Sequence, residues 1–139
     1  MEYNQTASEP SWKQLMRLME SKLLDIIRKE HKNETRICLY WVGGYWTAFE
    51  KSAYMLRQIF PKCEILVINH PSYPFSVVVA SVPDDELHNY GKTHIFCRNY
   101  LNYKELVYIK IYTTKYYSWH RRVTNKFSET INLLRQESV

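Results

Sequence analysis

Hydrophobic residues recur at three- and four-residue steps near both ends of the chain. The pattern predicts an amphipathic helix over 11–30 and a last helix over about 118–136. Ser11, followed three residues later by Gln14, is typical of a capping box at the start of the first helix. Residues 1–10 carry no such pattern and are predicted to be a disordered lead-in.

Short apolar runs between these helices predict strands. Residues 36–42 are apolar on both faces, which indicates a central position in a sheet. Further strands are expected at 65–68, at 75–80 and at 106–112, where apolar and polar positions alternate. Residues 93–98 are compatible with a strand or with a helical turn.

Two shorter helices are predicted between the strands. One is indicated by the spacing of Trp46, Phe49, Ala53, Leu56 and Phe60, and it ends before Pro61. The other begins at Pro83-Asp84-Asp85, where acidic side chains favour a helix start, and it ends at Gly91. The order α-β-α-β-β-α-β-α predicts a single α/β domain over 11–136, with a mixed β-sheet flanked by helices.

Composition narrows the class of protein. The 139 residues suffice for one domain with its own core. The net charge of +5 favours an anionic partner, and the twelve Tyr and four Trp indicate either a binding face or an aromatic-rich core. The apolar runs are too short to span a membrane, and no signal-peptide pattern is present, so we expect a cytoplasmic protein without membrane contact.

The cysteines and the polar motifs give little indication of chemistry. Cys38, Cys63 and Cys97 form no C-x-x-C pair, and Cys38 and Cys97 are expected to be buried free thiols. The acidic residues 84–86 are explained by a helix start, and the five histidines show no metal-ligand spacing. Because no nucleophile is paired with a base, we expect no catalytic residue, no metal, no cofactor and no enzyme activity.

Aromatic residues surround the only adjacent glycines of the chain. The apolar run 37–42 leads into Gly43-Gly44, and Tyr45 and Trp46 follow directly. The sequence predicts a strand, a tight turn and a helix, with bulky rings displayed at the turn. Large aromatic side chains at a surface turn favour a binding role.

A second segment combines aromatic and basic side chains. Residues 115–122 read Lys-Tyr-Tyr-Ser-Trp-His-Arg-Arg, so Lys115, Arg121 and Arg122 could neutralise phosphates while rings stack on bases. The alternative is an ordinary strand end followed by a solvated helix start.

Two motifs resemble a known family. Residues 39–49, LYWVGGYWTAF, resemble the L-F-R-x-G-D-F-Y-E-x-F segment of the amino-terminal mismatch-recognition domain of MutS DNA mismatch-repair proteins. Residues 82–90, VPDDELHNY, resemble the family's G-V-P-x-x-x-L-x-x-Y segment, and the helix at 11–30 matches the family's opening helix. The resemblance covers about residues 11–112.

The resemblance implies DNA binding with altered specificity. In the family, the phenylalanine of F-x-E is a wedge beside a mismatched base, and the glutamate hydrogen-bonds that base. Tyr45 and Thr47 occupy these two positions, and Gly44 replaces the aspartate of G-D. An aromatic wedge is therefore retained at Tyr45, whereas the acidic contact is lost.

The sequence thus predicts a non-catalytic module that binds double-stranded DNA, either distorted or mismatched. The predicted DNA-binding residues are Tyr45, Trp46, Thr47, Lys115, Arg121 and Arg122. The alternative is a protein-protein interaction module on the same scaffold, because Tyr, Trp and Arg dominate such interfaces. A basic band on the face of Tyr45 would favour DNA, and an apolar, uncharged face would favour a protein partner.

Overall fold

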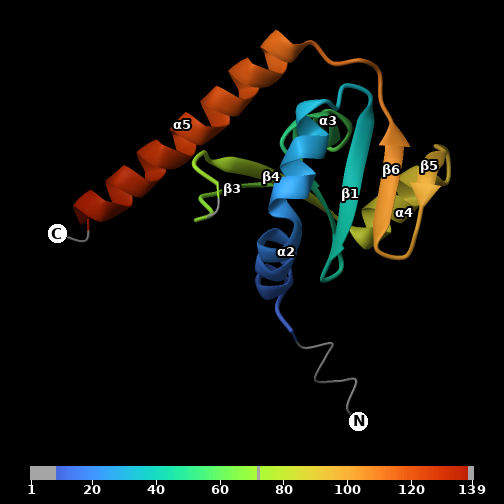
Figure 1. The fold of residues 1–139 in the computed structure, drawn as a ribbon, viewed down its shortest axis with the longest axis horizontal. Coiled ribbons are helices and arrows are strands. Elements are labelled where there is room, and N and C mark those ends of the chain that lie inside the picture. The colour runs from blue at the N-terminus through green and yellow to red at the C-terminus, as the bar shows by residue number, and fades with distance from the viewer. Residues whose placement is uncertain (1–8, 72, 138–139) are drawn as a thin grey trace.

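A computed structural model describes residues 9–71 and 73–137, which form a six-stranded sheet covered by four helices (Figure 1). The helices are α2 (Ser11–His31), α3 (Lys51–Ile59), α4 (Asp84–Gly91) and α5 (Thr113–Glu137). The strands are β1 (Arg36–Val42), β2 (Tyr45–Phe49), β3 (Glu64–Ile68), β4 (Val77–Pro83), β5 (Phe96–Asn99) and β6 (Tyr103–Val107). The lead-in predicted over 1–10 lies outside the described residues except for Glu9 and Pro10.

The strands follow the order β3-β4-β2-β1-β6-β5, and every pairing is antiparallel. The prediction of one α/β domain is confirmed, but the prediction of a mixed sheet is wrong. For three of the five pairs, β1–β2, β3–β4 and β5–β6, the connection is too short for the crossover that a parallel pair needs.

The central position predicted for 36–42 is confirmed, because β1 lies between β2 and β6. Its side chains alternate between two cores: Ile37 and Leu39 belong to one, and Val42 to the other. Helix α2 covers the face that contains Val42, and α3, α4 and α5 contribute to the core on the opposite face (Figure 1). The apolar residues that α2 buries are Leu15, Met19, Leu23 and Ile26.

The helix predicted to begin at Trp46 is wrong at its start. Gly43 and Gly44 have φ of 54° and 94° and form a two-residue turn, so that Val42 pairs with Tyr45 in a β-hairpin. The chain then continues as β2, and helix α3 begins only at Lys51. Both faces of β2 are covered, and a buried strand can be apolar at almost every position. The apolar run after the turn was therefore compatible with a strand as well as with the predicted helix.

Other boundaries differ by a few residues. Strand β3 adds Glu64 to the predicted 65–68, and β4 begins at Val77 and continues to Pro83. The ambiguous segment 93–98 contains the start of β5. The strand predicted over 106–112 is instead Tyr103–Val107, and α5 begins at Thr113, five residues earlier than predicted.

The burial of Cys97 and the role of Ser11 differ from what the sequence predicts. Cys38 is buried as predicted, but Cys97, on the edge strand β5, is exposed. Pro10, not Ser11, is the N-cap of α2. The Ser11 hydroxyl donates to the carbonyl of Gly43 at 3.0 Å, and a Cβ on Gly43 would lie 2.7 Å from that hydroxyl oxygen. Glycine at position 43 therefore permits the close approach of α2 to the hairpin turn.

A buried carboxyl group connects α2 with α3 and β1. Glu30 accepts hydrogen bonds from the Ser52 N–H at 2.7 Å, the Ser52 hydroxyl at 2.6 Å and the Asn33 amide at 3.3 Å. The Ser52 oxygen in turn accepts from the Cys38 N–H at 2.9 Å. Burial raises the pKa of Glu30 from 4.5 to about 7, although these hydrogen bonds act in the opposite direction.

Replacing Leu39 with Ala should lower the free energy of unfolding by ~2–5 kcal/mol, because Leu39 has no exposed surface and the truncation leaves a cavity. Urea denaturation would measure the change. A loss below ~0.5 kcal/mol would contradict the central position of β1, since even small truncations in a packed core cost at least this much.

Glu30→Gln should remove part of the pH dependence of folding. The folded-state pKa of Glu30 is raised, so its contribution to stability is present below pH 4.5 and is lost as the pH rises through 7. The total loss in the wild type is about 3 kcal/mol for a shift of this size.

The measurement is the difference in unfolding free energy between wild type and Glu30→Gln at several pH values, in which the other titrating groups cancel. The difference should change between about pH 4.5 and 7. If it stays constant, Glu30 has an ordinary pKa in the folded protein.

Candidate functional site

The candidate site lies at the turn of the β1–β2 hairpin. Tyr45 is the first residue of β2 and is paired with Val42 on one side and with Pro83 on the other. The N–H of Asp84 donates to the carbonyl of Gly44 at 3.1 Å, so the start of α4 is fixed against the turn. The Tyr45 side chain remains 39% exposed.

Tyr45 lines a groove between α2 and the sheet. The exposed rings of Trp12 and Tyr45 and the exposed side chain of Leu66 contribute to its walls, and Leu15 and Val42 provide buried apolar surface. Its volume is about 280 Å³. The groove therefore combines three exposed hydrophobic side chains from α2, β2 and β3.

Trp46 lies on the opposite face of the sheet from Tyr45. Its indole is 3% exposed, and its Nε1–H donates to Asp84 Oδ1 at 2.8 Å. The ring centre lies 5.2 Å from that of Trp41, and Lys104 Nζ lies 5.0 Å from the Trp46 ring. Trp46 thus supports the hairpin from behind and presents no surface to a ligand in the groove.

Thr47 lines the same groove as Tyr45 but is only 1% exposed. It is paired with Ser81, and the two hydroxyl oxygens are 3.1 Å apart. This hydrogen bond occupies the side chain, so direct contact with a ligand would require the groove to open.

The structure does not bring Lys115, Arg121 and Arg122 together with Tyr45. All three lie on α5, and Lys115 and Arg122 border a surface depression with Tyr54 and Trp119. Trp119 belongs to the core on the face covered by α3 and α5, whereas Tyr45 lines a groove on the face of α2. The predicted residues therefore occupy two separate surfaces.

The charges near Tyr45 are mainly acidic. Glu64 lines the groove, and Asp85 and Glu86 follow Pro83, the strand partner of Tyr45. Lys13 follows Trp12 in α2, and its Nζ lies 5.8 Å from the Trp12 ring. No lysine or arginine is among the described residues that line the groove.

Sequence reasoning missed two residues of this groove. The three- and four-residue spacing makes Trp12 the first apolar position of the helix predicted over 11–30, but it lies in the first turn of α2 and is exposed. Leu66 was placed in an apolar run, and only the register of β3 against β4 shows that it lies level with Phe49 on the face of α2. No signal in the sequence could have placed Leu66 beside Trp12.

Comparisons with protein families, curated proteins and solved structures yield no match. The resemblance to the MutS domain therefore rests on the two motifs quoted above. Within the described part of the chain, no group of three or more His, Cys, Asp or Glu residues could hold a metal ion. None of the helices described is both long and apolar enough to cross a membrane.

Tyr45 and Trp46 should respond differently to truncation. Trp46→Ala should lower the free energy of unfolding by ~3–5 kcal/mol, because it empties a core position and leaves Asp84 without its indole donor. Tyr45→Ala should leave stability within about 1 kcal/mol, because the ring is largely at the surface. Parallel thermal and urea denaturation of the two variants would test this, and equal losses would contradict the assignment of the faces.

Proposed function

We propose that this chain is a protein-interaction module and that the groove formed by Trp12, Tyr45 and Leu66 receives an apolar anchor side chain of the partner. The observation that carries the proposal is that three hydrophobic side chains from separate elements are exposed around one groove without a lysine or arginine among its described lining. Aromatic residues around a hydrophobic pocket are typical of binding hot spots.

The size of the groove supports a side chain as its occupant. A volume of about 280 Å³ lies at or below the range of pockets that enclose drug-sized ligands or cofactors. It is adequate for one leucine, phenylalanine or tryptophan side chain of a docked segment. The rest of the contact would then be made by the surface of the hairpin and the first turn of α2.

The charges suggest the neighbours of that anchor. Glu64 lines the groove and Asp85 and Glu86 lie beyond the strand partner of Tyr45, whereas Lys13 lies on the side of Trp12. A partner segment with a lysine or arginine beside its apolar anchor would be complementary to this arrangement.

Duplex DNA binding is the second candidate, and a specific observation favours it. Tyr45 is exposed directly after a rigid two-residue turn, which is the arrangement that an aromatic wedge needs in a minor groove. The resemblance to the MutS domain and the net charge of +5 agree with this candidate. The location of Lys115, Arg121 and Arg122 on another surface weakens it.

One set of variants distinguishes the two candidates. We expect peptides selected from a random display library for binding to the domain to carry an aromatic or leucine anchor beside a basic residue. The selected peptides should bind the Tyr45→Ala and Trp12→Ala variants more weakly than the wild type. Triple replacement of Lys115, Arg121 and Arg122 by Ala should leave this binding unchanged. Tyr112→Ala, which removes an exposed tyrosine elsewhere, is the matched control.

DNA binding differs from this in its salt dependence and in its response to the triple variant. Labelled matched and mismatched duplexes would bind with an affinity that falls steeply between about 50 and about 200 mM salt, each phosphate contact contributing about −0.9 to the slope. The triple variant would then flatten the slope, and Tyr45→Ala would cost ~1–3 kcal/mol of binding. Such a result, without selection of anchored peptides, would refute the protein-interaction proposal.

A further inference from the structure

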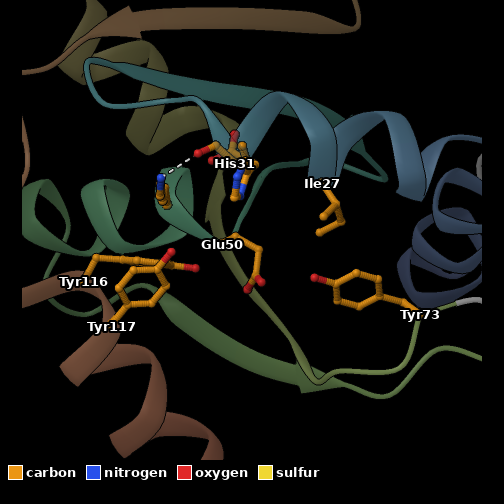
Figure 2. Close-up of a pocket in the computed structure, with 8 residues that line it drawn as sticks. Ile27, His31, Glu50, Tyr73, Tyr116 and Tyr117 are labelled. Carbon is orange, nitrogen blue, oxygen red and sulfur yellow. Dashed lines mark hydrogen bonds between the residues drawn. The ribbon is translucent and has the colours of Figure 1, made fainter. Parts of the chain in front are cut away.

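A second cavity lies far from the hairpin turn, between the C-terminal part of α2, the start of α3 and the start of α5 (Figure 2). Its walls include Ile27 from α2, Glu50 at the junction of β2 and α3, Tyr73 from the β3–β4 connection, and Tyr116 and Tyr117 from α5. The volume is about 120 Å³, enough for several waters or for one small organic ion.

Glu50 has a strained backbone at this cavity. Its φ of 52° is the one positive value among the non-glycine residues that the structure describes. Carboxylate oxygen Oε2 accepts from the Val78 N–H at 3.0 Å and is 2.9 Å from His120 Nε2. The other oxygen, Oε1, has no hydrogen-bond partner within the described chain. Strain of this kind clusters at functional sites.

Three phenol groups surround this carboxylate. Figure 2 shows the rings of Tyr73, Tyr116 and Tyr117 around Glu50, with the hydroxyl groups directed toward the space beside it. None of the three hydroxyls has a hydrogen-bond partner among the residues described. Tyr116 is only 4% exposed. The hydroxyl groups open onto the cavity, so they are available to a molecule that enters it.

Two carboxyl groups, Glu30 and Glu50, line the cavity together with Lys51 and His31. Lys51 Nζ donates to the carbonyl of His31 at 2.8 Å. Glu30 is engaged by Ser52 and Asn33 and its pKa is raised to about 7, so it is about half ionised near neutrality, whereas Glu50 presents the carboxylate oxygen that has no partner in the described chain. Burial and the charge of Glu50 raise the pKa of Tyr116, which keeps this phenol neutral and able to accept a hydrogen bond.

We propose that this cavity binds a small primary ammonium ion of the alkylammonium class. The ammonium group would donate hydrogen bonds to Glu50 Oε1 and to phenol oxygens of Tyr73, Tyr116 and Tyr117. The faces of the tyrosine rings would add cation–π attraction. A carboxylate and aromatic rings together complement an organic cation, and the small volume selects a short alkyl group.

Methylammonium chloride is the probe for the test, added to the full chain with sodium chloride at equal ionic strength as the reference. We expect a saturable rise of the melting temperature with methylammonium, because a ligand that binds only the folded state stabilises it. Tetramethylammonium should produce no such rise, since it has no N–H donor and is larger. Isothermal titration calorimetry would give the dissociation constant.

Conservative variants identify the contacts. Tyr117→Phe and Tyr73→Phe each remove one hydroxyl and should weaken methylammonium binding about 10-fold or more, the range for one hydrogen bond to a charged group. Glu50→Gln keeps an acceptor for Val78 but removes the charge, and should abolish binding. Tyr112→Phe removes a hydroxyl that does not line the cavity and should bind like the wild type.

Two results would overturn the proposal. One is an equal effect of methylammonium and sodium, which would mean that the cavity holds water only. The other is unchanged affinity in both Tyr117→Phe and Tyr73→Phe. If Glu50→Gln fails to fold, Tyr117→Phe and Tyr73→Phe still test the proposal. Tyr117→Phe should fold, because Tyr117 is half exposed and the variant retains its ring. The result is independent of the partner that binds at the hairpin groove.

Discussion

The bend of the chain at Glu50 is the constraint on which the rest of the structure depends. Positive φ at a residue with a side chain costs of order 1–3 kcal/mol. Here the N–H of Glu50 donates to Val78 O at 2.9 Å, and its carboxylate accepts from the Val78 N–H and pairs with His120. One residue thereby ends β2, starts α3 and attaches both β4 and α5. These contacts offset the strain, and α3 can fold back over the sheet.

The hairpin shows where sequence reasoning succeeded and where it failed. Two adjacent glycines predicted a tight turn at Gly43-Gly44, and the turn is present because both positions need positive φ. The segment after it was predicted as a helix, because apolar residues on a strand covered on both faces leave no alternation to detect. The error moved the start of α3 by five residues. It also concealed that Tyr45 and Trp46 face opposite sides of the sheet.

The sequence could not predict which residues far apart in the chain lie close together in the fold. Helix α2 was predicted correctly, yet the contact of Ser11 with Gly43 depends on how that helix crosses the sheet. The sequence left open whether the basic residues of 115–122 share the face of Tyr45, and the structure shows that the sheet separates the two surfaces. Local patterns determine which residues share a helix face or a strand face. They do not determine which helix covers which face when all helices are amphipathic.

The two candidate sites lie near opposite ends of α2. Trp12 borders the hairpin groove, and Ile27 borders the cavity beside Glu50. Trp12 and Ile27 are 15 positions apart, which corresponds to about 22 Å along a helix. A side chain bound in the groove cannot therefore touch a small ion bound in the cavity. The apolar residues of α2 pack against one continuous core between the sites, so any influence of one on the other would require a shift of α2 against the sheet. The hydrogen bonds of Ser11 at one end and Glu30 at the other oppose such a shift.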